Sequence, residues 1–259
     1  MSPKSKIIIV QCVIILLLMG VLFHQYYKES IEILSDGLLS PRVYTHIIDS
    51  QSYLVLNYDP LEEEIEYFIE ENHLNVSVYV ENLRTGAAMG VQEKEAYIPG
   101  SLSKVFVAVI IMKEIEEGKF SLETELPILE SDKDSHWGTL YTESVQELPI
   151  STLLEEMLQE SDNTALNVLL RNIDSEEYDI LLGKYYGYYD QNENQEYSSE
   201  MTVNPLTIYN LYSSLYLSTV LEAEHSEYIL SLLTNTSFPI HDIAEIPEDA
   251  TIAHKFGNR

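Results

Sequence analysis

The stretch YIPGSLSKVFVAVIIM, residues 97–112, determines how the rest of this chain is interpreted. Residues 105–112 are apolar on every side, which predicts a helix buried in the core. Ser101 and Lys104 are three residues apart, so their side chains share one helix face. Burial would lower the pKa of Lys104 and let its amine take the proton of the serine hydroxyl. Serine is also a common helix N-cap, and the stretch alone favours that alternative.

Strands and helices are predicted on both sides of this stretch. Residues 76–83 and 87–98 flank Arg84-Thr85-Gly86, which is a hairpin signal. TIAHKFGN at 251–258 is typical of a short strand. This order predicts an α+β domain in which strands from both ends of the domain meet in one sheet. Helical periodicity recurs in four further segments, at 59–73, 150–160, 164–173 and 203–221.

The helix predicted at 59–73 is amphipathic. Its acidic side chains are expected to face solvent, since a run of like charges is most often a solvated face. Its apolar face, expected to pack on the domain, consists of Leu61, Ile65, Phe68 and Ile69.

Composition excludes several classes of function. The chain has 14 lysines and arginines against 43 aspartates and glutamates, a formal charge of -29, so a nucleic acid would be repelled. Hydrophobic residues make up 45% of the 259 residues, which is enough for a sizeable core. Cys12 is the only cysteine, so the chain beyond it has no disulfide and no thiolate chemistry.

The N-terminus has the pattern of an uncleaved membrane anchor. MSPKSK is basic, and the apolar run at 7–23 is at the low end of a bilayer span. No small residues suited to signal cleavage follow the run, which favours an anchor; a buried core helix is the alternative. The lysines place the N-terminus in the cytoplasm and the rest outside, in a single-pass arrangement at the cell membrane. We expect the cytoplasmic N-terminus and the transmembrane anchor to span residues 1–25, followed by a stalk at 26–58 and a folded catalytic domain at 59–259.

Two further short motifs change the interpretation of Ser101. Ser161-Asp162-Asn163 falls between two predicted helices, and Lys255-Phe256-Gly257 lies on the last predicted strand. Each of the three patterns occurs once, in this order. About residues 50–258 therefore resemble the class A serine β-lactamases and the penicillin-binding proteins, whose signature is S-x-x-K, S-D-N and K-T-G. The resemblance implies an antiparallel sheet flanked by helices, together with an all-α lobe.

The resemblance also implies functions for individual residues. Ser101 would attack a β-lactam or a D-Ala-D-Ala-like carbonyl and become acylated, with Lys104 as general base. Ser161 would pass a proton to the leaving nitrogen, and Asn163 would hold Lys104 and the substrate. In the K-T-G motif, which includes Gly257, Lys255 would attract the substrate carboxylate. The backbone N–H groups of Ser101 and Asn258 would form the oxyanion hole. No metal and no organic cofactor is implied.

The sequence departs from the family pattern in three places. The deacylating glutamate, followed four residues later by asparagine, is missing at the matching place, Tyr185 to Asp190. Asp190 or Glu193 is a candidate substitute, and Glu196 and Glu200 are also near. Of these glutamates only Glu200 has an asparagine four residues later, Asn204, and Glu200 lies C-terminal to the matching place. Phe256 stands where the family has Thr or Ser, which puts β-lactam affinity in doubt. The family's last two strands and closing helix have no counterpart before Arg259, so we expect a C-terminally truncated domain.

These observations predict a membrane-anchored serine hydrolase, a monomer that acts on β-lactams or peptidoglycan stem peptides. A slowly deacylating penicillin-binding protein is one alternative, because the deacylating glutamate is missing. A non-catalytic relative that binds the cell wall is the other, because Phe256 alters the third motif.

Overall fold

The computed structural model describes residues 57–174, 202–243, 246–247 and 249–257, together with Leu38, Tyr178 and Gly183. Apart from Leu38, these belong to one unit, Asp49–Arg259. The predicted anchor at 7–23 lies outside the described residues. Within the described part, no helix is long and apolar enough to cross a membrane.

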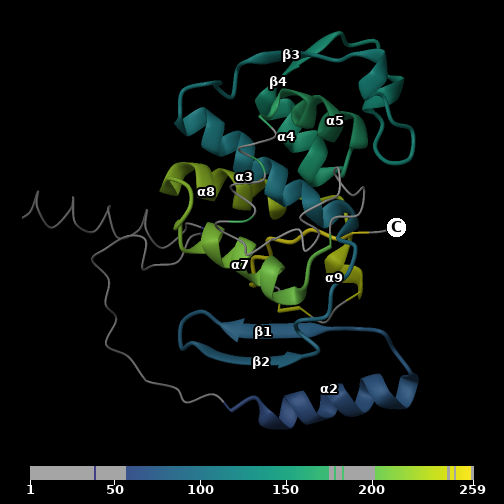
Figure 1. Ribbon diagram of the computed structural model, residues 1–259, viewed down its shortest axis with the longest axis vertical. Helices are drawn as coiled ribbons and strands as arrows, with labels where there is room; N and C mark the ends of the chain where they lie inside the picture. The colour runs from purple at the N-terminus through teal and green to yellow at the C-terminus, as the bar shows by residue number, and fades with distance from the viewer. Residues whose placement is uncertain are drawn as a thin grey trace, which may run out of the picture. The chain divides into compact units, whose positions relative to one another are not determined.

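A β-hairpin forms one layer of the domain. Strand β1 (Val78–Asn82) pairs antiparallel with β2 (Ala87–Val91), with Val78 opposite Val91 and Asn82 opposite Ala87. Gly86 closes the turn in the left-handed region, at φ 77°, which glycine adopts without a Cβ clash. Helix α2 (Asp59–Asn72) packs against β2, and α7 (Pro205–Tyr216) packs against β1, so the hairpin lies between two helices (Figure 1). The predicted hairpin is confirmed.

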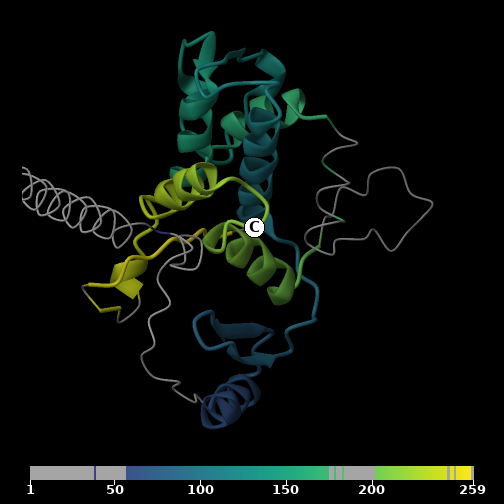
Figure 2. The same ribbon diagram turned by 90° about the vertical axis from the view of Figure 1, so that its left-hand side faces the viewer.

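The core is built around α3 (Ser103–Glu116). Its residues 105–112 are all 0–1% exposed, as expected for a helix that is apolar on every side. Helices α4 (Ile150–Gln159), α5 (Asn163–Asn172) and α8 (Ala223–Leu233) pack against it (Figure 1, Figure 2). The remaining elements are β3 (Glu125–Pro127), β4 (Glu147–Pro149), α9 (Ile240–Ile243) and the 3-10 turns Gly100–Leu102, Glu130–Asp132 and Leu140–Thr142. The α+β class is confirmed.

The strands differ from the prediction in two ways. Strands β3 and β4, which both have the sequence Glu-Leu-Pro, pair as a second small sheet. Three residues are too few for an alternating pattern to be recognised in the sequence. The strand predicted at 251–258 is wrong for residues 251–257, which have no strand assignment. There the backbone N–H of His254 donates to the carbonyl of Leu233, the last residue of α8, and not to a neighbouring strand.

Helix α2 buries less of its apolar face than predicted. Ile69 is buried and Ile65 half-buried, whereas Leu61 is 42% and Phe68 58% exposed. Residues 65 and 69 are one turn apart and face β2, which packs against α2. Position 68 lies about 100° around the helix from Ile69. Leu61 shares the face of Ile65 but stands in the first turn of α2, and the prediction was wrong for these two side chains.

Candidate active site

Ser101 and Lys104 lie at the buried start of α3. Ser101 is in the 3-10 turn Gly100–Leu102, one turn before Lys104, and the Lys104 Nζ donates to the Ser101 Oγ at 3.0 Å. No side chain caps this turn or α3, so the N-cap alternative is wrong. The neighbouring Ser103 hydroxyl instead donates to the carbonyl of Gly100 at 2.8 Å. The only serine hydroxyl of this turn that the lysine contacts is therefore that of Ser101.

Lys104 joins the first two sequence motifs. Its Nζ lies 2.8 Å from the Ser161 carbonyl oxygen, 3.2 Å from the Ser161 hydroxyl and 2.7 Å from the Asn163 Oδ1. The side chain is 1% exposed. This burial lowers its pKa to about 8, although the charges of Asp162 and Asp134 act in the opposite direction. About a tenth of Lys104 is therefore neutral at pH 7.

The Ser-Asp-Asn turn is held in an unusual conformation. Ser161 has a φ of 59°, in the left-handed region that serine rarely adopts. The following Asp162 is fully buried; one carboxylate oxygen accepts from the N–H of Ala165 and caps α5, and the other accepts from the N–H of Leu140, both at 2.9 Å. These bonds aim the hydroxyl and the carbonyl of Ser161 at Lys104.

Residues 134–140 form a loop against this turn that the sequence patterns did not reveal. The carbonyl of Trp137 accepts from the backbone N–H of Asn163 at 3.0 Å, and the Asp134 carboxylate accepts from the Asn163 side-chain amide at 3.4 Å. A hydrogen bond from the backbone N–H of His136 is the main cause that lowers the pKa of Asp134. Asn163 is therefore fixed from both sides. The only feature of the sequence that could have drawn attention to this loop is Trp137, the one tryptophan of the chain.

Gly138 is required where this loop meets the Ser-Asp-Asn turn. Its φ is 91°, and a Cβ would lie 2.0 Å from an Asp162 carboxylate oxygen. We expect Gly138→Ala to lower the free energy of unfolding by about 2–4 kcal/mol, from left-handed strain and overpacking together. Gly118→Ala is the control, since Gly118 has a φ of 77° but no atom within 4 Å of a Cβ; it should cost about 1 kcal/mol. Denaturant unfolding measures both, and equal losses would contradict the close contact.

The third motif runs along the start of α3. A Cβ on Gly257 would lie 2.5 Å from the Pro99 carbonyl oxygen and 3.4 Å from the Ser101 backbone nitrogen, so only glycine allows this approach. Lys255 is 9% exposed. Burial, and secondarily the charge of Lys104, lowers the pKa of Lys255 to about 8. Asn258, the other predicted oxyanion-hole residue, lies outside the described residues.

Phe256 belongs to an aromatic cluster next to these groups. Its ring stacks on Phe238, with centroids 4.0 Å apart and planes at 25°. It also meets the ring of Trp137 edge to face, with centroids 5.8 Å apart. The Lys255 Nζ lies 5.5 Å from the Phe256 ring centre. The third motif thus places an aromatic ring, and no hydroxyl, beside Lys255.

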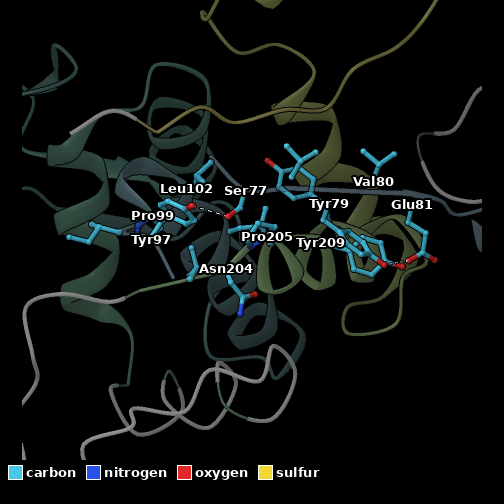
Figure 3. A pocket seen from close by; sticks show the side chains of 15 residues that line it. Ser77, Tyr79, Val80, Glu81, Tyr97, Pro99, Leu102, Asn204, Pro205 and Tyr209 are labelled. Carbon is cyan, nitrogen blue, oxygen red and sulfur yellow. Dashed lines mark hydrogen bonds between the residues drawn. The ribbon is translucent and has the colours of Figure 1, made fainter. Parts of the chain in front are cut away.

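A cavity of about 690 Å³ lies behind the serine turn, between β1 and α7 (Figure 3). Pro99 and Leu102 line it, but Ser101, Lys104 and Ser161 do not. At one end, the Tyr79 hydroxyl donates to the Glu81 carboxylate at 2.7 Å (Figure 3). Burial, followed by this bond, raises the pKa of Tyr79 to about 12. The cavity thus borders the serine turn, but none of Ser101, Lys104 and Ser161 is among its lining residues.

The candidate deacylating residues Asp190, Glu193, Glu196 and Glu200, and the place from Tyr185 to Asp190, also lie outside the described residues. In the ranges that are described, no cluster of three or more His, Cys, Asp and Glu side chains is arranged to hold a metal ion.

Comparison with known proteins shows the family to which this chain belongs. The sequence model of the β-lactamase enzyme family matches residues 60–259, and the chain therefore belongs to that family. Membership supports an enzyme of the serine hydrolase type. No curated protein sequence matches significantly.

Solved structures share the fold. PBP-A is 20% identical, with a TM-score of 0.67 over 77% of each chain. The TLA-3 extended-spectrum β-lactamase is 20% identical, with a TM-score of 0.68 over 78% of each chain. A β-lactamase from Xanthomonas campestris pv. campestris is 20% identical, with a TM-score of 0.67 over 79% of this chain and 80% of its own. At these identities the likeness shows the β-lactamase fold alone.

Proposed function

We propose that this chain is a class A-type serine hydrolase that forms an acyl-enzyme on Ser101 with β-lactams or D-Ala-D-Ala-like peptides. The observation that supports this best is the position of the Lys104 amine, within 3.2 Å of the Ser101 hydroxyl, the Ser161 hydroxyl and the Asn163 amide oxygen. A base beside the nucleophile, held by further polar groups, is the arrangement that activates a serine.

The contacts of Lys104 suit it to be a base. The two shortest, to the Ser161 carbonyl and the Asn163 amide oxygen, are to atoms that only accept hydrogen bonds. A neutral amine has two N–H bonds and one lone pair. If the two N–H bonds satisfy these oxygens, the lone pair remains for the proton of Ser101, 3.0 Å away. The surroundings therefore direct the basic electron pair of Lys104 to the nucleophile.

Acylation then follows with its protons accounted for. The Ser101 oxygen bonds to the substrate carbonyl carbon while Lys104 takes the hydroxyl proton. The C–N bond breaks, and the leaving nitrogen receives a proton through the Ser161 hydroxyl, which lies 3.2 Å from the Lys104 amine. The backbone N–H groups of Ser101 and Asn258 would stabilise the oxyanion, and Lys255 would supply positive charge for a substrate carboxylate.

Mass spectrometry of the intact protein after exposure to benzylpenicillin tests this function. The expected result is a mass increase of one penicillin, mapped to the peptide that contains Ser101. Turnover of nitrocefin then separates the alternatives, because a β-lactamase releases its acyl group and a slowly deacylating penicillin-binding protein retains it. Muropeptide binding without any adduct would favour the non-catalytic relative.

The rate of acylation should depend on pH through both buried lysines. Lys104 acts only when neutral, and its pKa is about 8, so the rate should rise about tenfold per pH unit below pH 8. Lys255 attracts a carboxylate only when protonated, and its pKa is also about 8, with Glu160 opposing the lowering. A carboxylate β-lactam should thus give a bell-shaped profile with its maximum near pH 8, and an uncharged substrate only the rising limb. Stopped-flow acylation across pH 6–10 measures this; a flat profile would contradict Lys104 as base.

We further propose that residues 7–23 anchor the chain, as a monomer, with its catalytic domain outside the cell membrane. The basic N-terminus and apolar run support this. Digestion of intact cells by an external protease should remove the domain and leave the N-terminus protected; a domain protected in intact cells would contradict it.

A further inference from the structure

We propose that Phe256, with Trp137 and Phe238, forms an aromatic subsite beside Ser101 that favours substrates with an uncharged, aromatic group where a β-lactam has its carboxylate. The proposal rests on the acyl-enzyme function above and specifies the substrate class of that site. The observation that carries it is that the ring of Phe256, in the third motif, meets the ring of Trp137, in the loop bonded to Asn163, and stacks on Phe238.

The subsite is held in place by the backbone. The carbonyl of Trp137 accepts from the backbone N–H of Asn163, and Gly138 lets the loop touch Asp162, so the backbone that carries the indole is fixed at the Ser-Asp-Asn turn. On the other side, Gly257 sits against the nitrogen of Ser101, so Phe256 is fixed one residue from that contact. Phe256 and Trp137 therefore join the third motif to the loop that holds the second.

The cluster is a surface as well as a packing contact. Trp137 is 40% exposed, and Phe256 and Phe238 are each half-buried, so their rings retain area for a ligand. Aromatic groups bind such rings by stacking or edge-to-face contact. A ligand aromatic group next to Ser101 would complete the cluster.

A carboxylate finds a less favourable environment there. The Phe256 ring offers a carboxylate no hydrogen-bond donor. The centre of this ring lies 5.5 Å from the Lys255 Nζ, beside the group that would attract the carboxylate. Lys255 itself is only 9% exposed, so an anion must lose water to reach it. The formal charge of -29 also disfavours the approach of anions. Charge and shape both favour the uncharged aromatic group.

Benzylpenicillin and its benzyl ester test the proposal, because they share the reacting β-lactam ring and differ only at the carboxylate. In both, the Ser101 oxygen bonds to the ring carbonyl, the C–N bond breaks and the nitrogen takes the proton. We expect the wild-type protein to be acylated faster by the ester. In Phe256→Thr the ratio of the two rates, ester over acid, should fall about tenfold, and in Phe256→Leu about threefold. The control is Phe68→Thr, an exposed ring on α2 that should leave the ratio unchanged.

Binding to Ser101→Ala separates this inference from the proposed function. Trp137 is the only tryptophan, so its fluorescence reports directly on the subsite. The ester should bind more tightly than the acid and change the emission, and Phe256→Thr in that background should remove the preference. If this holds while wild type forms no adduct, the proposed function fails and the subsite stands. A rate ratio or binding preference unaltered by Phe256→Thr, or no binding of either compound, overturns the subsite.

Discussion

Alanine at position 101 is expected to abolish covalent labelling of the protein by a fluorescent penicillin. The Ser101 oxygen is the atom that becomes acylated, and no other hydroxyl of its turn contacts Lys104. The rate of labelling should fall by at least about 10⁴-fold, as expected when a catalytic nucleophile is removed. Gel fluorescence after a timed exposure measures this loss.

Ser103→Ala is the matched control, because it removes a hydroxyl two residues away in the same turn. That hydroxyl donates to the Gly100 carbonyl, so its loss should cost about 1 kcal/mol of stability and leave labelling intact. Equal labelling of the two variants, or a label that disappears only with Ser103→Ala, would show that the nucleophile is assigned wrongly.

Methionine at position 104 should lower the acylation rate by about 10³-fold while Ser101 remains in place. The substitution keeps a long unbranched side chain at a site that is 1% exposed, and it removes the amine that takes the serine proton. General-base catalysis contributes about 10²–10⁴-fold, which sets the size of the effect. Single-turnover acylation by benzylpenicillin measures it, and the rising limb of the pH profile should vanish with the amine.

Two further variants test whether Lys104 acts as a base or only by its charge. Lys104→Arg keeps donors for the surrounding oxygens but stays charged, so it should be as slow as methionine if a base is needed. Lys113→Met removes another lysine of the same helix, which pairs with Glu116, and should acylate at the wild-type rate. An arginine variant that acylates normally would mean that Lys104 acts by its charge and not as a base.

Local patterns predicted the helical part of the domain well. Residues 105–112 are apolar on every side, which required burial of α3. The Ser-Asp-Asn break between two periodic segments matches the end of α4 and the start of α5. The Ser101–Lys104 contact was also predictable, because a spacing of three residues places two side chains on one face. These features depend on residues near in sequence.

Features that depend on distant segments were not predictable in the same way. No local pattern indicated that 134–140 would lie against Asn163, or that β3 and β4 would pair across twenty residues. The strand expected at 251–258 was wrong over 251–257, because a strand needs a partner and this segment bonds to the end of α8 instead. The exposure of Leu61 and Phe68 likewise depends on what packs against α2.

The sequence by itself determined the three motifs, their order and the face shared by Ser101 and Lys104. Only the tertiary structure decided that Lys104 is enclosed by Ser161 and Asn163, and that Phe256 meets Trp137 across the site. The physical reason is that the pKa of Lys104 depends on which distant groups exclude water from it, and that a contact between two rings depends on which distant segments pack together. That is set by packing between segments more than fifty residues apart, such as Lys104 and Ser161, and not by the residues that adjoin it in the chain.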